Sequence, residues 1–199
     1  MATGTSISSC LANRIPCVLL RPAADDTFPV WSPDGKYIAF IRRRTQAEGD
    51  IMLIPSIGGP ERSLHPINIG FSVEGAGRLM AWTPDGKWVC FTSRESAEPH
   101  HRLFLLSTES GTTRPLLSKA GTNDADDDAS PAFSLDGHWL VCARFYGPFN
   151  SRLWFQRITD DIHTEGEPLA VSNTMDNATA PVWLPDSKRV LFLDSYDIE

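Results

Sequence analysis

Short apolar runs, separated by polar turns, recur along the chain at a nearly constant interval. Continuous apolar residues occupy positions 38–41, 89–91, 140–143 and 190–193. Each run is too short for a helix and does not alternate with polar residues, which predicts β-strands covered on both faces. A second set of runs at 51–54, 103–106 and 153–155 follows at matching offsets and predicts a further strand in each unit. No segment has a convincing helical pattern.

The same turn precedes the first apolar run of every unit. The aromatic residue before this turn is Trp31, Trp82, Phe133 or Trp183, so the interval is 51, 51 and 50 residues (31 to 82, 82 to 133, 133 to 183). The first copy reads Ser-Pro-Asp-Gly, in which proline presets φ and aspartate and glycine suit the next two positions. Ser187 replaces glycine in the fourth copy, where we expect a strained or different turn.

Four short strands in about 50 residues are typical of one blade of a β-propeller. The predicted fold is therefore all-β, a β-propeller of about four blades with four antiparallel strands each, forming a partial ring. The predicted blades span 29–67, 79–118, 129–171 and 179–199, the last incomplete. Residues 15–22 are predicted to be the outer strand of a preceding or closing blade, after an N-terminal tail at 1–14. A piece of a larger ring is favoured over closure by that N-terminal strand.

The motif Pro-x-Trp-Ser-Pro-Asp-Gly-Lys-x-Ile-Ala-Phe at 29–40 is followed by Ile-x-Leu-Ile-Pro at 51–55 and Gly-Gly-Pro-Glu-Arg at 58–62. This pattern resembles the TolB-like, WD40-like β-propeller repeat, and the resemblance extends from about residue 15 to 195. It implies a fold that also occurs in periplasmic TolB, in the non-catalytic domains of prolyl-oligopeptidase-type and tricorn-type peptidases, and in sensor regions of bacterial kinases and transcription regulators.

Composition and charge exclude several classes of function. The net charge is −7, which argues against a nucleic-acid-binding surface. No apolar run has the roughly 18 residues that a membrane span needs. The first 20 residues lack the pattern of a signal peptide, which favours the cytoplasm, with the periplasm as the alternative if the true N-terminus is missing. Cys90 and Cys142 lie in apolar runs and are predicted to be reduced core thiols.

Catalytic chemistry is not expected within this chain. The Gly-x-Ser-x-Gly motif of serine hydrolases does not occur, and residues 70–75 miss it by one position. His138 occupies a turn position where other copies have lysine, and the adjacent His100 and His101 would point to opposite faces of a strand. We therefore predict no catalytic residue, no metal site and no cofactor. The aromatic residues at 31, 82, 133 and 183 are predicted to pack in the core, and Tyr37, Trp88 and Trp139 between blades.

Aspartates precede the inner strand of three units. Propeller geometry would bring the loops of Asp25 and Asp26, of Asp127 and Asp128, and of Asp176 to one face. Such a face could bind a basic segment of a protein partner, with calcium as a weaker option. The alternative is that these aspartates only cap turns in solvated loops.

The sequence thus favours a non-catalytic scaffold for protein–protein interaction or ligand sensing within a larger protein. The alternative is the propeller domain of a prolyl-oligopeptidase-type or tricorn-type peptidase, which gates a catalytic domain outside this chain.

Overall fold

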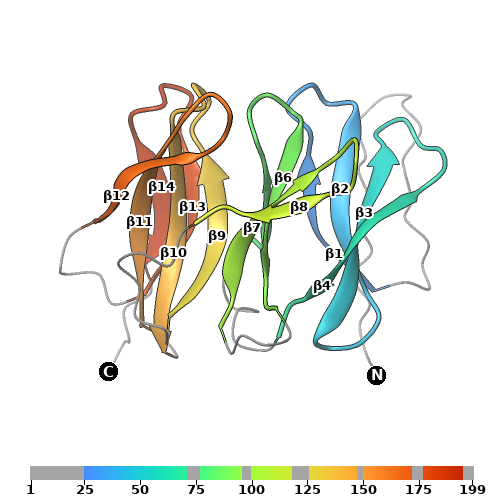
Figure 1. Cartoon of the computed structure of the whole chain (residues 1–199), viewed down its shortest axis with the longest axis horizontal. Helices are drawn as coiled ribbons and strands as arrows, with labels where there is room; N and C mark the ends of the chain where they lie inside the picture. The colour runs from blue at the N-terminus through green and yellow to red at the C-terminus, as the bar shows by residue number, and fades with distance from the viewer. Residues whose placement is uncertain are drawn as a thin grey trace.

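The structure is a computed structural model that describes residues 25–70, 77–95, 100–117, 126–147, 150–171 and 177–194. In these residues every regular element is a β-strand, and the strands form four antiparallel sheets (Figure 1). The predicted segments 1–14 and 15–22 lie outside the described residues. The first sheet contains β1 (Asp25–Trp31), β2 (Tyr37–Arg43), β3 (Glu48–Pro55) and β4 (Arg62–Asn68); the second contains β5 (Met80–Trp82), β6 (Trp88–Ser93), β7 (Arg102–Ser107) and β8 (Thr113–Pro115); the third contains β9 (Asp127–Phe133), β10 (Trp139–Gly147), β11 (Asn150–Ile158) and β12 (Thr164–Ala170); the fourth contains β13 (Ala178–Trp183) and β14 (Val190–Asp194).

The sheets are arranged as consecutive propeller blades. Strands within each sheet are paired in chain order, so each blade is an antiparallel meander. The innermost strands contact one another in sequence, β1 with β5, β5 with β9, and β9 with β13. In Figure 1 the first blade stands at the right and the second in the middle, the third and fourth overlap at the left, and the outer strands β8 and β12 cross the front. The predicted all-β propeller fold with four-stranded antiparallel blades is confirmed.

The recurrent turn is held by a serine or threonine hydroxyl that bonds the aspartate two residues later. In the first blade, the Ser32 hydroxyl donates to Asp34 Oδ1 at 2.7 Å and accepts the Tyr37 N–H at 2.9 Å. Gly35 has the left-handed φ of 70° that this turn requires. Ser187 takes the same conformation at φ 54°, so the strain predicted for the fourth turn is confirmed.

The apolar runs form the contacts between neighbouring sheets. Residues 38–41, 89–91 and 140–143 are buried, and the second and third sheets each lie between two neighbouring sheets. The prediction is wrong for 190–193, where Leu191 and Leu193 are 61% and 66% exposed. Among the described residues the fourth sheet ends the series, so only its face toward the third sheet is covered.

The tryptophan before the turn packs against the preceding blade in the second and fourth sheets. The Trp82 indole is buried and donates its N–H to the Val30 carbonyl at 3.1 Å, and Trp183 donates to the Ala132 carbonyl at 3.0 Å. Trp31 occupies the same position in the first blade but is 49% exposed. The prediction of a core position is wrong for Trp31, because no earlier blade is present among the described residues to receive it.

Cys90 and Cys142 are buried free thiols, as predicted, and burial raises the pKa of both. Within the described ranges, no helix is long and apolar enough to cross a membrane.

Candidate functional site: a groove between blades

The predicted acidic face is divided between exposed and buried carboxylates. Asp25 and Asp26 begin β1, and Asp127 and Asp128 begin β9, whereas Asp176 lies outside the described residues. Asp25 is exposed, but Asp26 and Asp128 are 2% and 0% exposed. The four carboxylates therefore do not present a common solvent-facing cluster.

Arginines of the neighbouring strand bind the two buried aspartates. Arg42 Nε and Nη2 donate to the Asp26 carboxylate at 2.8 and 2.9 Å. Arg144 Nε donates to Asp128 Oδ1 at 2.7 Å, and both members of this pair are almost fully buried. Burial raises the pKa of Asp128, while the hydrogen bond from Arg144 acts in the opposite direction. These charges are compensated inside their own sheets, so the partner-binding role of these aspartates stays a prediction.

Asp127 instead connects two blades. Its Oδ1 accepts the backbone N–H of His101 at 2.6 Å and lies 2.9 Å from His101 Nδ1. His101 precedes β7 in the second sheet and is buried. Burial alone would raise the pKa of Asp127, but the hydrogen bonds from His101 outweigh it and hold the pKa below its usual range. This carboxylate is therefore part of the contact between the second and third blades.

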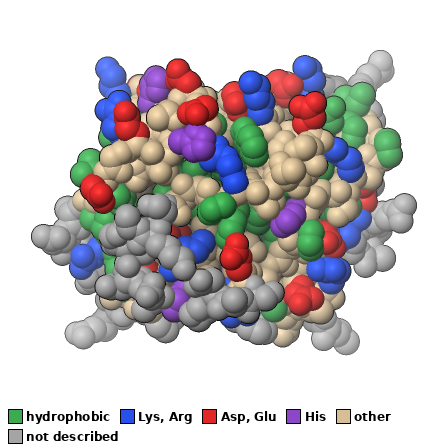
Figure 2. Space-filling model, in the orientation of Figure 1, with side chains coloured by type: hydrophobic (Ala, Val, Ile, Leu, Met, Phe, Trp, Pro, Cys, Tyr) green, Lys and Arg blue, Asp and Glu red, His purple; other side chains and the backbone are tan. Residues whose placement is uncertain are grey.

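Basic and acidic side chains are also mixed on the surface. On the face shown in Figure 2, Lys and Arg alternate with Asp and Glu along the upper edge. That edge contains the turns between the first two strands of the blades (Figure 1). The visible edge thus has no large area of a single sign.

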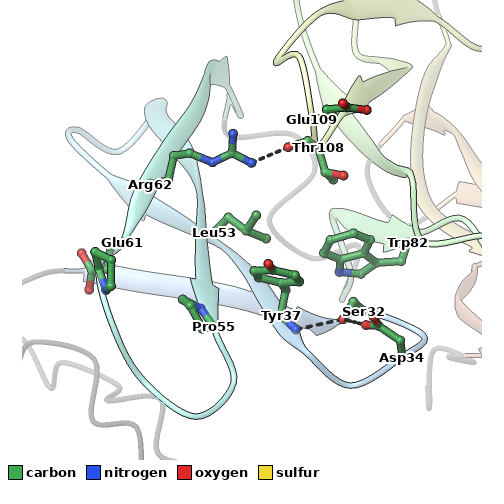
Figure 3. A pocket seen from close by; sticks show the side chains of 12 residues that line it. Ser32, Asp34, Tyr37, Leu53, Pro55, Glu61, Arg62, Trp82, Thr108 and Glu109 are labelled. Atoms are coloured by element: carbon green, nitrogen blue, oxygen red, sulfur yellow. Dashed lines mark hydrogen bonds between the residues drawn. The ribbon is translucent and has the colours of Figure 1, made fainter.

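A groove of about 580 Å³ lies between the first and second sheets (Figure 3). We name it the first inter-blade groove. Its walls combine aromatic, aliphatic and proline side chains with three carboxylates and one arginine. The lining residues are Ser32, Asp34, Tyr37, Leu53, Pro55, Pro60, Glu61, Arg62, Trp82, Gly86, Thr108 and Glu109.

The groove follows from the repeat geometry. Tyr37 begins β2 directly after the turn and is 42% exposed, and Leu53 projects from β3 nearby. In Figure 3, the Tyr37 and Leu53 side chains of the first sheet converge with Trp82 of the second. Arg62 of β4 spans the groove by donating to the Thr108 carbonyl. The resulting cavity has the size and the mixed lining of small-ligand sites, about 300–1,000 Å³.

The carboxylates of the groove differ in their availability. Glu61 Oε2 lies 2.5 Å from Arg42 Nη1, and Asp34 Oδ2 lies 3.1 Å from Lys36 Nζ. Glu109 is exposed, and no cation of the described residues lies within ion-pair distance of it. Figure 3 places Glu61 and Glu109 on opposite sides of the groove, with Glu61 away from Trp82.

The equivalent space between the second and third sheets is filled, and we name it the second inter-blade groove. Trp88 takes the position of Tyr37, and the Arg114 guanidinium lies 5.3 Å from its ring centroid. Arg114 also donates to the carbonyls of Asp161 and Ile162 at 3.1 and 2.9 Å. The Ile162 side chain is 5% exposed and packs in the core shared by these two sheets.

The turn between the third and fourth strands differs between the two grooves. Ile162 precedes β12 in this turn and has the left-handed φ of 60°, which is unusual for a β-branched residue. Gly111 has the corresponding conformation before β8, at φ 73°, but contributes no side chain. A Cβ atom added to Gly111 would have the Leu64 carbonyl oxygen as its nearest neighbour, at 3.5 Å.

Sequence reasoning placed Tyr37 between blades but did not find the groove. The sequence signal for a difference between the two grooves is glycine in one blade and isoleucine in the next at equivalent turn positions.

A third groove of about 670 Å³, lined by Trp139, Phe155 and Trp183 among others, lies between the third and fourth sheets.

Comparison with known proteins supports the fold and points to two kinds of relative. No family model matches the chain. The uncharacterized peptidase YuxL of Bacillus subtilis is 29% identical over 149 residues, which include 58% of this chain and 21% of that protein. TolB from Acinetobacter baumannii superposes with a TM-score of 0.71 at 13% identity, covering 98% of this chain and 44% of that one. A puromycin-hydrolyzing peptidase from Mycobacterium tuberculosis superposes with a TM-score of 0.63 at 18% identity, covering 87% of this chain and 26% of that one.

This chain therefore spans less than half the length of each of these three proteins. The solved structures share its blade architecture and the antiparallel order of its strands, which identifies the fold. The chain is built from consecutive blades of a TolB-like β-propeller, a fold that also forms the propeller domains of peptidases.

Proposed function

We propose that this chain is the propeller part of a prolyl-oligopeptidase-type peptidase and controls access to a catalytic domain encoded outside these 199 residues. The observation that carries the proposal is the 29% identity to YuxL, a protein named as a peptidase. The alignment involves only 21% of YuxL, which leaves room there for a separate catalytic domain. The puromycin-hydrolyzing peptidase supports the same arrangement, because this chain superposes on only 26% of it and the rest could hold a catalytic domain.

The chemistry of the chain agrees with a non-catalytic part in such an enzyme. The 199 residues contain no Gly-x-Ser-x-Gly motif, so a serine nucleophile of this type must come from elsewhere. A wall of blades with buried strands on both faces is rigid, and a rigid wall can exclude folded proteins while short peptides reach the catalytic centre. The propeller would thereby select substrates by size.

The test uses the full-length polypeptide that contains these residues. A fluorophosphonate probe should label one serine outside residues 1–199, and that serine should lie in a Gly-x-Ser-x-Gly motif. The intact enzyme should hydrolyse short peptides but spare a folded protein that contains the same cleavage sequence. Absence of both the motif and the labelling would rule out this function.

A non-catalytic binding scaffold is the second candidate. The open first inter-blade groove and the superposition with TolB over 98% of the chain favour it. A full-length protein without probe labelling that still binds a defined partner would support this candidate over the peptidase.

A further inference from the structure

We infer that the first inter-blade groove binds an extended peptide segment of a separate protein, in which an arginine lies beside an aliphatic residue. The inference goes beyond the proposed function, since a peptidase propeller and a scaffold could equally contain such a groove. It rests on how the molecule fills the equivalent positions of its other blades.

The first step concerns the aromatic residue that begins the second strand of each blade. An arginine covers two of these residues, since Arg114 lies 5.3 Å from the ring centroid of Trp88 and Arg157 lies 5.2 Å from that of Trp139. Tyr37 is the third member of the set, and no guanidinium in the described part of the chain lies over its ring. The Tyr37 ring can therefore accept a cation on its face, as the equivalent rings of two other blades accept an internal arginine.

The cause of the vacancy is visible in the strand register. Trp139 is paired across the strands with Arg157, whereas Tyr37 is paired with Pro55, which has no charge to place over the ring. Arg62 occupies the β4 position that corresponds to Arg114 of β8, opposite Leu53 rather than Leu105. The guanidinium of Arg62 donates to the Thr108 carbonyl, as that of Arg114 donates to carbonyls of the next blade, but only Arg114 also lies over the aromatic ring. An arginine from outside could therefore stack on Tyr37 without displacing an arginine of the described residues.

The second step concerns the aliphatic group. In the second inter-blade groove, Ile162 belongs to the core against which Trp88 packs, and its carbonyl accepts a hydrogen bond from Arg114. Gly111 occupies the equivalent turn position next to Thr108 and Glu109 of the first groove and contributes no side chain there. A ligand that fills the first groove in the way the protein fills the second must supply both groups, a guanidinium and an aliphatic side chain.

The third step is charge complementarity. Glu109 lies exposed at the rim, and no described cation is within ion-pair distance of it. The chain as a whole has a net charge of −7, which favours the approach of a cationic segment. An incoming arginine would thus find the Tyr37 ring and the Glu109 carboxylate along one groove.

The experiment is a fluorescence-polarisation titration of the purified protein with the labelled peptide Gly-Ile-Arg-Leu-Gly. The matched control peptide contains citrulline instead of arginine, which keeps the shape but removes the charge. We expect the citrulline peptide to bind about tenfold more weakly or worse, because it loses both the cation–π contact and the attraction to Glu109. No binding of the arginine peptide, or equal binding of both peptides, would overturn the inference.

Protein variants locate the site. Tyr37→Ala and Glu109→Gln should each weaken binding by about three- to tenfold, whereas Tyr37→Phe should keep most of it. Trp31→Ala and Glu165→Gln are the matched controls, because they remove an exposed aromatic ring and an exposed carboxylate outside the groove. Each variant is compared by circular dichroism to show that it is folded. Unchanged affinity in folded Tyr37→Ala would contradict the inference even if the peptide binds elsewhere.

Discussion

The first and second inter-blade grooves use the same positions of the repeat, but the first is hollow and the second is filled. Leu53 and Leu105 occupy equivalent positions in β3 and β7, since they pair with the equivalent residues Ala39 and Cys90. Leu53 is 6% exposed, packs in the core shared by the first and second sheets and also lines the cavity of about 580 Å³, whereas Leu105 is fully buried in the core shared by the second and third sheets. A single repeat pattern therefore supports two different interfaces.

The difference arises in the turns rather than in the strands. Ile162 brings a buried side chain into the second groove, at the expense of a left-handed backbone conformation. Gly111 adopts that conformation without strain but adds nothing to the interface. The strands build a shared core in both pairs of blades, and the first pair differs in that a groove lies beside this core.

The largest expected effect comes from truncating the equivalent leucines. Leu105→Ala should lower the free energy of unfolding by about 3–5 kcal/mol, because it opens a cavity in a closed core. Leu53→Ala should cost less, about 2–3 kcal/mol, because Leu53 is buried in the core of the first and second sheets but also borders the groove, so that less new cavity is enclosed. Urea unfolding followed by tryptophan fluorescence measures both values.

Leu103, also fully buried in the second sheet, provides a control for general damage to this blade. Leu103→Ala should resemble Leu105→Ala rather than Leu53→Ala. Equal losses for Leu53→Ala and Leu105→Ala would mean that the first groove closes in solution, and the comparison between the grooves would fail.

A second prediction concerns the hydrogen bonds between Asp127 and His101, which connect the second and third blades. Asp127→Ala removes the acceptor of a buried N–H and should cost about 1–3 kcal/mol at neutral pH. Because the pKa of Asp127 is lowered in the folded protein, its contribution is complete above the unfolded pKa of about 3.9 and is lost as the pH falls through the folded value. The difference between Asp127→Ala and the parent should therefore shrink below about pH 4.

Asp127→Asn is the matched variant, because its amide oxygen can still accept the His101 N–H but does not titrate. It should retain much of the stability at neutral pH and lose its dependence on pH in this range. A constant difference between Asp127→Ala and the parent from pH 3 to 7 would contradict this account.

The blade framework could be predicted from sequence because it depends on short-range rules repeated four times. Turn chemistry at Ser32 and Asp34, together with continuous apolar runs, is sufficient to define a hairpin covered on both faces. The strain at Ser187 followed from the same rule, since a turn that requires positive φ keeps that requirement when glycine is replaced.

The groove and the buried pairs could not be predicted in the same way, because they depend on contacts between segments far apart in the chain. Asp26 and Asp128 look like loop aspartates in sequence, yet the strand register places Arg42 and Arg144 opposite them. Trp31 and Trp82 have the same local sequence, and only a preceding blade makes Trp82 a core residue. The position of a residue within the series of blades, rather than its local sequence, thus decides whether it is buried and what it pairs with.

A smaller effect is expected from the arginines that span the two grooves. Arg114→Ala should cost about 1–2 kcal/mol, because it removes the stacking on Trp88 and two hydrogen bonds to the next blade. Arg62→Ala should cost about 0.5 kcal/mol, since Arg62 is exposed and bonds one carbonyl. Thermal unfolding measures both, with Arg94→Ala as a surface control. A larger loss for Arg62→Ala than for Arg114→Ala would reverse the assignment of open and filled grooves.

The smallest effect tests whether the first groove is open to solvent. Hydrogen bonds from the Ser32 hydroxyl and the Lys36 N–H lower the pKa of Asp34 to about 2, and this carboxyl is exposed. Ser32→Ala should raise that pKa toward its ordinary value, because the largest cause of the shift is removed. The contribution of the turn to stability should be complete above about pH 4 and fade only as the pH approaches 2, and NMR titration of the Asp34 carboxyl measures the midpoint. If the first groove were closed, burial would raise the pKa of Asp34 and oppose the effect of these hydrogen bonds. A titration midpoint of Asp34 above its ordinary value in the parent protein would therefore show that the first groove is closed like the second.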